Sequence, residues 1–291
     1  MAWLRKNAEA LLRNPLYAAA FAALCMFMPF MAWLGWGWLV LATLRYGYRY
    51  CAYVSVGATL GIIVLVGLLE GAWSLAWFNI GVFIIPLALF ALLLRQSVSM
   101  NFTLQCVAIA ILVLLLIADF FQVMTPTAIS TFLKCRFEQV ITTDPTVAQN
   151  LDVFAEQFAW SWPTGLFWVY VFGLFLGRWF QAALDNPGGF KREFYSLRLN
   201  FWIGCAAFII IALSFVLPPS VLLIATVGLT LNVLVLFGLS LVYKWVEAKN
   251  WSKWIIVGVY ILLLLLPVVA LPALSMLAVI DSVADLRKKL V

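Results

Sequence analysis

The sequence contains no histidine, few charged residues and only five cysteines. Histidine is the side chain that most often transfers protons or binds metals near neutral pH, so its absence removes much of the usual catalytic and metal-binding chemistry. The cysteines are scattered and form no CxxC pair, which supports neither a zinc site nor a disulfide framework. We expect small apolar packing residues at all five positions, and neither a metal nor a cofactor is implied.

Carboxylates are equally sparse where catalysis would need them. The acids within or beside apolar runs each fall in a different segment: Glu70, Asp119, Glu247 and Asp281. A hydrolase or transferase needs a nucleophile with a base, or carboxylates placed together. The sequence has no GxSxG motif and no Gly-rich loop ahead of a Lys-Ser or Lys-Thr pair. We therefore expect no catalytic residues and no enzyme activity, and any energy from ATP would come from a partner.

The sequence is rich in apolar and aromatic residues. Hydrophobic residues make up 66% of the 291 positions and aromatic residues 16%, and the mean hydropathy is +1.08. Apolar runs long enough to cross about 30 Å of hydrocarbon recur along the chain. These features predict an all-α integral membrane protein with about nine transmembrane helices, embedded in a lipid bilayer. The expected spans are residues 16–29, 37–45, 52–69, 73–94, 104–123, 164–181, 199–217, 220–243 and 254–279.

Several boundaries follow from proline, glycine and polar stretches. Residues 1–15 have the pattern of an interfacial amphipathic helix. Pro29 and the Gly35-Trp36-Gly37 sequence divide the first apolar run into a helix, a crossover and a short second helix. Residues 182–198 form a loop, and residues 199–291 a three-helix part with a basic tail.

Residues 124–160 interrupt the apolar runs and have the pattern of a folded segment. Asp144-Pro145 is a helix start, and apolar residues then recur at helical spacing: Val147, Leu151, Phe154 and Phe158. Two interpretations remain open: an amphipathic helix resting at the membrane interface, or a lid over the mouth of a pocket.

The distribution of lysine and arginine predicts the orientation. With the N-terminus in the cytoplasm, thirteen of the eighteen basic residues fall on cytoplasmic segments, and residues 124–160 lie outside. The net charge of +6 is therefore a topology signal and indicates no nucleic-acid partner. Nine spans would place the C-terminus outside, although Arg287-Lys288-Lys289 favours the cytoplasm. Because Pro267 and Pro272 break the last apolar run, a re-entrant or bent final segment is the alternative.

Tryptophans gather at the expected outer end of the spans, near three polar side chains. Indoles at one depth are typical of an interfacial belt. The alternative is an outward-facing aromatic pocket, in which Asp119, a carboxylate at membrane depth, contributes to function instead of reaching water at the interface. The predicted ligand-binding residues are Trp33, Trp36, Trp73, Trp77, Asn79, Asp119 and Trp162.

Two features suggest protein partners. Small residues recur four apart in the first span, which lets helices approach closely within this chain or against another: Ala18, Ala19, Ala22 and Ala23. The loop at 182–198 carries Phe190, Lys191 and Arg192. Its basic residues are explained by the positive-inside rule for cytoplasmic loops. Its aromatic residues suggest, as the alternative, a surface on which a partner docks.

The order of several short motifs resembles the YybS-like family of bacterial membrane proteins, whose function is not established. The resemblance covers nearly the whole chain and rests on four segments: Leu44-Arg45-Tyr46-Gly47, the loop from Phe190 to Leu199, Asn232 with Gly238-Leu239-Ser240, and Asp281-Ser282 through Arg287-Lys288-Lys289. It implies a multi-pass protein of the bacterial inner membrane.

The first six spans of that family are similar to the substrate-binding S components of energy-coupling-factor transporters. This similarity implies a six-helix, S-component-like bundle at 16–181, with a binding loop from Pro29 to Trp38. It also implies docking to a coupling subunit through Ala18 with Ala22, or Ala19 with Ala23. The three additional spans at 199–279 have no counterpart in S components and would occupy the place of that coupling subunit.

The leading hypothesis is therefore a subunit that binds or transports a small molecule at an outward-facing aromatic pocket. The alternative is a scaffold or assembly factor without catalytic activity, which holds a protein partner in the membrane or cytoplasm. A pore ranks third, because the sequence shows no repeated charged ring.

Overall fold

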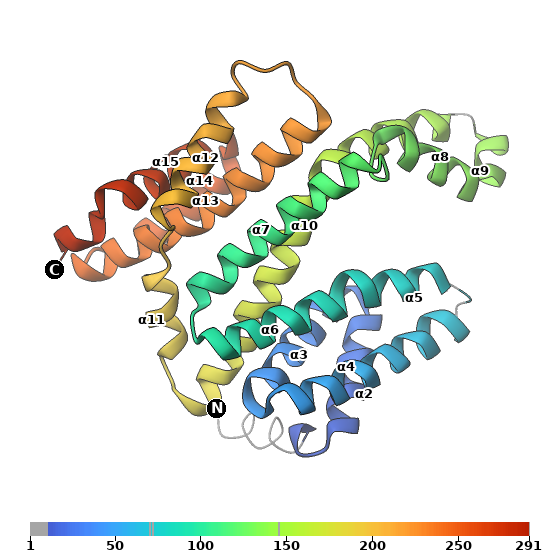
Figure 1. Ribbon diagram of the computed structural model, residues 1–291, viewed down its shortest axis with the longest axis horizontal. Helices are drawn as coiled ribbons and strands as arrows, with labels where there is room; N and C mark the ends of the chain where they lie inside the picture. Colours follow the sequence, from blue (N-terminus) through green and yellow to red (C-terminus); the bar gives the residue numbers. More distant parts are fainter. Residues whose placement is uncertain (1–10, 70, 72, 145, 291) are drawn as a thin grey trace. The chain divides into compact units, whose positions relative to one another are not determined.

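The computed structural model describes residues 11–69, 71, 73–144 and 146–290, which form helices and loops without a β-strand (Figure 1). The predicted all-α class is confirmed. Six described helices are long and apolar enough to cross a membrane, and the bent pair Gly189–Ser196 and Phe201–Leu213 would make a seventh. The six are Tyr48–Leu68, Trp73–Ser97, Met100–Phe120, Thr146–Asp185, Val221–Ala248 and Pro267–Ala284. The protein thus has the make-up of a multi-pass membrane protein, whereas the predicted count of nine is not confirmed.

Two apolar helices fall short of that length. They are Pro15–Phe27 and Trp254–Leu265, both of which were predicted as spans or parts of spans. Of the predicted interfacial helix at residues 1–15, positions 1–10 lie outside the described part of the chain.

Contacts between residues divide the chain into two units. Unit 1 extends to Val107 and includes Trp168–Phe194, and unit 2 comprises Ala108–Phe167 and Tyr195–Val291. The division passes through two long helices, α7 (Met100–Phe120) and α10 (Thr146–Asp185). It therefore differs from the boundary after residue 181 that the sequence suggests. The two units are described separately below.

Unit 1 is a bundle of short apolar helices. It contains α2 (Pro15–Phe27), α3 (Ala32–Tyr46), α4 (Tyr48–Ile62), α5 (Trp73–Asn79), α6 (Ile85–Ser97) and most of α11 (Gly189–Ser196). The start of α7 and the part of α10 from Trp168 onward also belong to this unit. Two π-helical segments, Ile63–Leu69 and Ile80–Ile84, extend α4 and connect α5 to α6.

Small residues set the spacing of helices in unit 1. The four alanines of α2 are buried: Ala18, Ala19, Ala22 and Ala23. They face the glycines of α4, because a Cβ atom on Gly57 would come within 2.6 Å of the Ala19 Cβ, and one on Gly61 within 2.5 Å of the Ala23 Cβ. The alanine face therefore contributes to close packing inside this chain. As a surface for docking a partner it is not accessible in this structure.

The predicted break at Gly35-Trp36-Gly37 is wrong, because α3 runs through all three residues. The chain turns earlier, around Met28, and a short 3-10 turn at Pro29–Met31 leads into α3. The glycines permit close helix packing instead of a turn: a Cβ on Gly35 would strike α2, and one on Gly37 would strike Leu176 of α10. The predicted binding loop from Pro29 to Trp38 is therefore mostly helix.

Unit 2 contains a pair of helices at one end of α7. These are α8 (Pro126–Arg136) and the N-terminal half of α10, with the short α9 (Glu138–Thr143) between them. The predicted helix start is confirmed, since the Asp144 carboxylate accepts a hydrogen bond of 2.9 Å from the Thr146 N–H. The helix does not stop at residue 160, however. It continues through Pro163 to Asp185, so that α10 has 40 residues in total and a length of about 60 Å.

The predicted polar segment is thus continuous with a candidate span. Lys134 on α8 forms an ion pair of 2.7 Å with Asp152 on α10, and Ser130 donates a hydrogen bond to the same carboxylate. Both ion-pair partners are substantially exposed, so the pair positions α8 and contributes little to stability.

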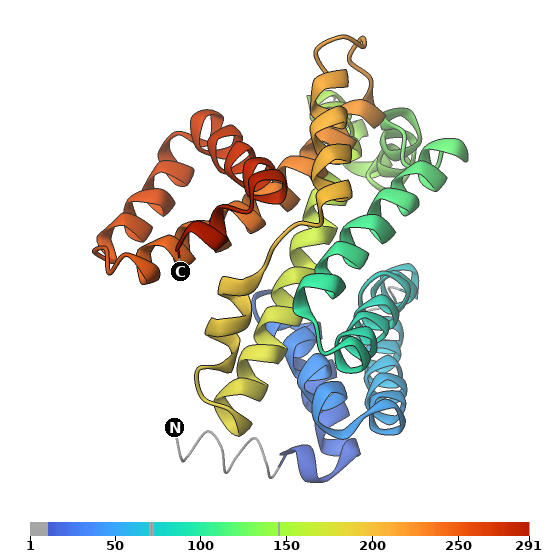
Figure 2. The same cartoon turned by 60° about the vertical axis from the view of Figure 1, so that its left-hand side comes forward.

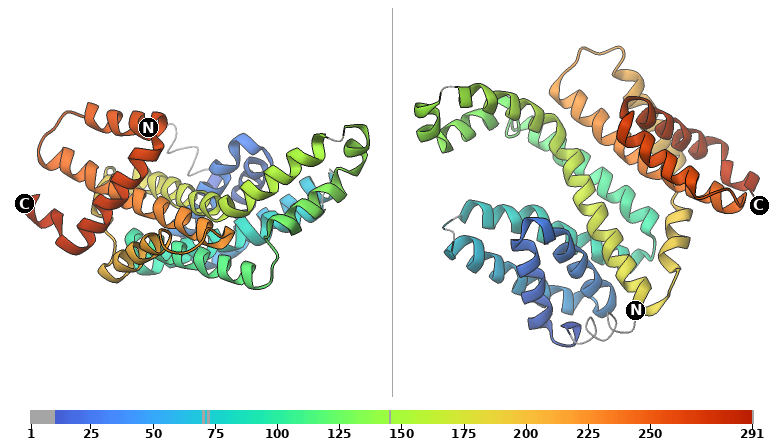
Figure 3. Two further views of the ribbon diagram at one scale, coloured as in Figure 1. Left: turned by 90° about the horizontal axis from the view of Figure 1, so that it is seen from above. Right: turned by 180° about the vertical axis from the view of Figure 1, so that it is seen from behind.

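The remainder of unit 2 is a bundle of four helices. It contains α12 (Phe201–Leu213), α13 (Val221–Ala248), α14 (Trp254–Leu265) and α15 (Pro267–Ala284), drawn in orange to dark red in Figure 3. A core of aliphatic side chains joins α13 to α14 and α15: Val235, Leu239, Val242, Val246, Leu274, Ile256, Val259 and Leu263.

The last two helices form a hairpin, as Figure 2 shows, in place of the single predicted span 254–279. With 12 residues, α14 extends about 18 Å, which is short of a membrane crossing. Its Tyr260 hydroxyl lies 3.2 Å from that of Tyr243, near the C-terminal end of α13. α15 then returns alongside α13, and its C-terminal end lies beside the segment that precedes α12. The chain end and residues 195–199 therefore share one side of unit 2, as the bent final segment predicts.

Candidate functional site

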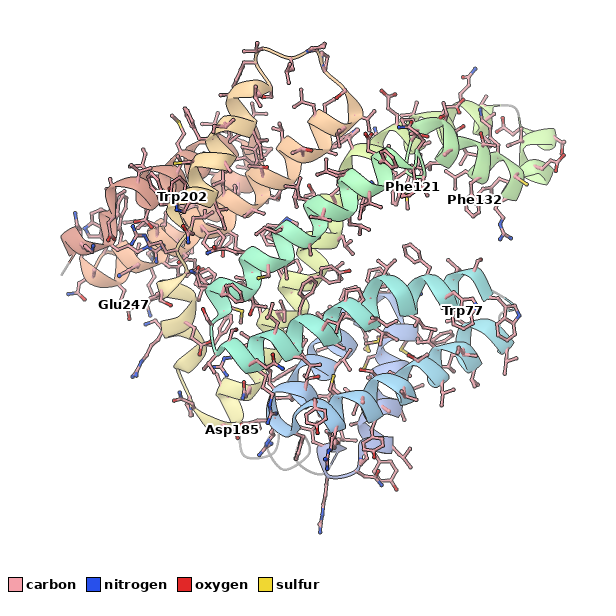
Figure 4. All side chains as sticks on the ribbon, viewed as in Figure 1. Trp77, Phe121, Phe132, Asp185, Trp202 and Glu247 are labelled. Carbon is pink, nitrogen blue, oxygen red and sulfur yellow. The ribbon has the colours of Figure 1, made fainter. Side chains whose placement is uncertain are left out.

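A pocket of about 320 Å³ lies at one end of unit 2, where four helices meet. Its walls come from the end of α7, the start of α8, the middle of α10 and the start of α13. Figure 4 marks this end by Phe121, just after α7, and Phe132 on α8. The residues that the argument uses are Ala118, Asp119, Gln122, Thr125, Trp162 and Ser220. The pocket thus combines an apolar lining with a few polar groups, which is typical of small-molecule sites.

Asp119 is the one charged residue among the side chains that line this pocket. It lies half-buried in the last turn of α7, and its backbone carbonyl accepts hydrogen bonds from the Gln122 N–H and side-chain amide. Within the part of the chain that the structure describes, its carboxylate has no hydrogen-bond or ion-pair partner. A half-buried carboxylate without a partner favours an approaching positive charge.

Two helix starts form the opposite polar part of the lining. Thr125 caps α8, because its hydroxyl oxygen accepts from the Ala128 N–H at 3.3 Å, and Ser220 caps α13 by accepting from the Leu223 N–H at 3.1 Å. Both caps satisfy backbone donors that a helix start leaves free. The Thr125 hydroxyl donates to the Gln122 carbonyl at 3.4 Å, whereas the Ser220 hydroxyl remains at the pocket as a donor.

Trp162 supplies the aromatic wall. Its indole nitrogen is buried and has no hydrogen-bond partner in the described structure. A buried N–H without an acceptor is costly, so an ordered water or a bound molecule that reached it would be stabilising. Asp119 and Trp162 were predicted as site residues on separate grounds, and the structure brings them together.

The other five predicted ligand-binding residues belong to unit 1, where Trp33 and Trp36 lie on α3 and the remaining three lie on α5. Trp33 lines an open, almost wholly apolar groove with Phe172, Phe175, Leu176, Trp179 and Phe190. Trp36 contacts Phe83, with ring centroids 5.3 Å apart. Trp73 and Trp77 are exposed, and the Asn79 amide donates to the Leu75 carbonyl of its own helix. A single site lined by all seven residues remains a prediction.

The loop predicted as a partner surface is largely helical. Phe190 and Phe194 of α11 both lie edge-on to Phe175 of α10, and Arg178 forms an ion pair with Glu193. This arrangement turns the aromatic side of α11 toward α10. Lys191 and Arg192 are exposed.

A second polar cluster, which we call the clasp, closes the other end of unit 2. Arg287 forms an ion pair of 2.7 Å with Asp281, and it donates further hydrogen bonds to the Tyr195 carbonyl and the Ser240 hydroxyl. Both charged side chains are almost completely buried, 6% and 4% exposed. The Ser240 hydroxyl donates to the Leu197 carbonyl, so the clasp ties the chain after α15 to α13 and to the start of α12.

Around the clasp, Asp285 accepts hydrogen bonds from Lys288 and Arg198. The Lys288 hydrogen bond, followed by the charge of Arg198, lowers the pKa of the Asp285 carboxyl below its usual value. The other Asp281 oxygen, Oδ1, is buried without a partner.

Sequence reasoning missed the clasp and the two capping residues of the pocket. The clasp had a visible signal, because Ser240, Asp281 and Arg287 lie in two of the four segments that carry the family resemblance. Asp281 and Arg287 are only six residues apart, whereas Ser240 and the Tyr195 carbonyl are 47 and 92 residues from Arg287, so the sequence did not reveal these partners. Thr125 and Ser220 precede helices in the usual N-cap position, but only the fold places them at one pocket.

Comparison of the chain with protein-family models, with curated proteins and with solved structures finds no match in any of the three.

Proposed function

We propose that this chain is a subunit of a bacterial inner membrane that binds or transports a small molecule, with its N-terminus in the cytoplasm. The pocket formed by α7, α8, α10 and α13 carries the proposal. The resemblance to the YybS-like family, and through it to S components, agrees with a binding role.

Three properties of the pocket support binding. A volume of about 320 Å³ suits a small metabolite and lies at the lower end of the range for ligand sites. Its half-buried carboxylate sits at the end of a helix that is long enough to span a membrane. Ionisable groups at such positions are typical of sites for substrates and ions. The distribution of basic residues predicts that this end lies outside, so a molecule would reach it from the exterior.

Native mass spectrometry of the gently purified protein tests the proposal, with extraction and identification of retained small molecules. We expect one stoichiometric metabolite, which is lost when Ala118→Trp fills the pocket or Asp119→Asn removes its charge. Ala20→Trp is the control, because Ala20 is exposed on α2. If the wild-type protein retains nothing, or if both pocket variants retain as much as the control, the proposal is wrong.

Trp36→Ala extends this experiment to unit 1. Loss of the retained molecule in this variant would support the wider predicted site that includes Trp36. Retention would restrict the site to the pocket of unit 2.

The second candidate function is a scaffold that holds a protein partner at α11. The observation that favours it is the exposure of Lys191 and Arg192 on a helix whose aromatic side is fixed against α10. Pull-down in mild detergent tests it: a stoichiometric protein lost in a Lys191→Glu/Arg192→Glu variant supports a scaffold. An unchanged set of co-purified proteins contradicts it.

A further inference from the structure

We infer that the pocket of unit 2 takes a small organic cation, an amine or ammonium compound that also carries a hydrogen-bond acceptor. This inference rests on the proposed function and names the chemical class of its ligand. It is argued from the charge of the pocket, from the residues around it and from its aromatic wall.

The only formal charge among the side chains that line the pocket is negative. Asp119 is the one charged residue among the lining side chains, and its carboxylate has no partner among the described residues. Its position in the last turn of α7 adds the partial negative charge of the helix carbonyl groups. A cation bound there would gain from both, whereas an anion at this carboxylate would be repelled.

The basic residues of the α8 helix are engaged elsewhere and do not neutralise Asp119. Lys134 forms its ion pair with Asp152, and the Arg136 guanidinium lies 5.6 Å from the centre of the Phe132 ring. An intramolecular counter-ion would have made the Asp119 site structural. Its absence from the pocket lining leaves the carboxylate for a bound molecule.

The other residues that line the pocket indicate which further groups the ligand carries. The Trp162 ring provides an aromatic surface, on which a cation is stabilised by the electrons of the indole. The starts of α8 and α13 make the opposite side of the pocket electrostatically positive, and Ser220 offers a hydroxyl donor there. A hydroxyl, carbonyl or carboxylate oxygen of the ligand fits this side, with its amine at Asp119.

Three probes of the same shape but different charge test the inference. They are choline, its uncharged carbon isostere dimethylbutanol, and the related anion dimethylbutyrate, each titrated calorimetrically into the full-length protein. We expect choline to bind more tightly than the other two. Asp119→Asn should weaken choline about tenfold or more and leave dimethylbutanol unchanged. Trp162→Leu should weaken choline about threefold to thirtyfold.

Asp152→Asn is the matched control, since it removes a carboxylate of the same helical region that already has a partner. It should leave choline binding unchanged. A second measurement covers amines that choline does not represent. Metabolite extract from the expressing cells is separated into cationic, neutral and anionic fractions, and native mass spectrometry identifies the fraction from which the protein retains a molecule.

The outcomes separate the inference from the proposed function. Retention from the cationic fraction, lost in Asp119→Asn, supports both. Retention from the neutral or anionic fraction, lost in Ala118→Trp, overturns the cation inference and leaves the binding function intact. If no fraction supplies a retained molecule and no probe binds, the proposed function fails and the inference fails with it.

Discussion

The two units use different means to hold helices together. In unit 1, alanines of α2 meet glycines of α4 so closely that a single added methyl group has no space. In unit 2, the helices near the chain end surround a buried ion pair between Asp281 and Arg287. Packing of small residues depends on shape alone. A buried charge depends on its partner, because an unpaired ion in an apolar interior is strongly unfavourable.

Within unit 2, the polar side chains of the clasp are paired with each other, whereas the carboxylate at the pocket is not. In the clasp, Arg287 is matched by Asp281, Ser240 and a backbone carbonyl. In the pocket of the same unit, the Asp119 carboxylate has no partner within the described residues. The first arrangement joins three segments of the chain, and the second carries the proposed binding function.

The largest expected effect is an all-or-none difference in labelling, because the segments joined by the clasp should all lie on one side of the membrane. In a background without cysteine, Ser196→Cys and Lys288→Cys should react with an impermeant maleimide from the same side. Thr127→Cys, at the start of α8, should react only from the opposite side. Labelling of oriented vesicles measures this directly. If Lys288→Cys reacted together with Thr127→Cys, the α14–α15 hairpin would be contradicted.

Removal of one charge of the clasp should have the largest effect on stability. Arg287→Ala leaves Asp281 buried without a counter-ion, and we expect the free energy of unfolding in detergent to fall by about 3–5 kcal/mol. Lys288→Ala is the control on the same segment, because Lys288 is 84% exposed and the loss of its solvent-screened ion pair should change stability little.

An apolar replacement of both partners sharpens this test. The double variant Asp281→Leu/Arg287→Met removes both charges, so it should recover much of the stability that Arg287→Ala loses. Equal destabilisation by the single and the double variant would show that shape, and not charge, holds this region.

In unit 1 the effect should come from volume. Gly61→Ala places a Cβ 2.5 Å from the Ala23 Cβ, and we expect a loss of about 1–3 kcal/mol in the free energy of unfolding. The compensating variant Gly61→Ala/Ala23→Gly exchanges the two side chains and should restore most of it. Gly81→Ala is the control, because its added Cβ has no neighbour within 4 Å. Equal losses at positions 61 and 81 would exclude close packing as the cause.

The smallest expected effect is the pH dependence of the clasp surroundings. The folded protein lowers the pKa of Asp285, so this residue adds stability above its ordinary value of about 4, and the contribution is lost as the pH falls through the lowered value. Asp285→Asn should therefore flatten the stability profile below about pH 4. Acid titrations of thermal unfolding for both proteins measure this, and identical profiles would contradict it.

Hydropathy was sufficient to predict the helical class and most of the longer spans, because a helix of about 20 apolar residues satisfies its backbone hydrogen bonds within the segment and is long enough to cross the hydrocarbon. The sequence-based boundaries were wrong at glycine and proline, because these residues can end a helix or lie inside one. The glycines at 35 and 37 indicated a turn, yet they lie inside α3, where they allow close contact with α2 and α10. Pro163 likewise lies inside α10 without ending it.

Two residues of the candidate site could be recognised from the sequence alone. Asp119 stood out in the sequence because a carboxylate is rare in an apolar run, and Trp162 because indoles gather near interfaces. Their meeting at one pocket, and the contribution of Thr125 and Ser220, required the path of α8 and α13.

By itself, the sequence determined that this chain is helical, apolar and of membrane type, since composition and run length control the transfer of helices into lipid. Only the tertiary structure decided which polar groups meet. Arg287 reaches Ser240, which lies 47 residues earlier in the chain, because α15 packs alongside α13, whereas Asp119 remains without a partner in the described structure. Pairing depends on distances in space, and residues far apart in the sequence become neighbours only when the helices pack.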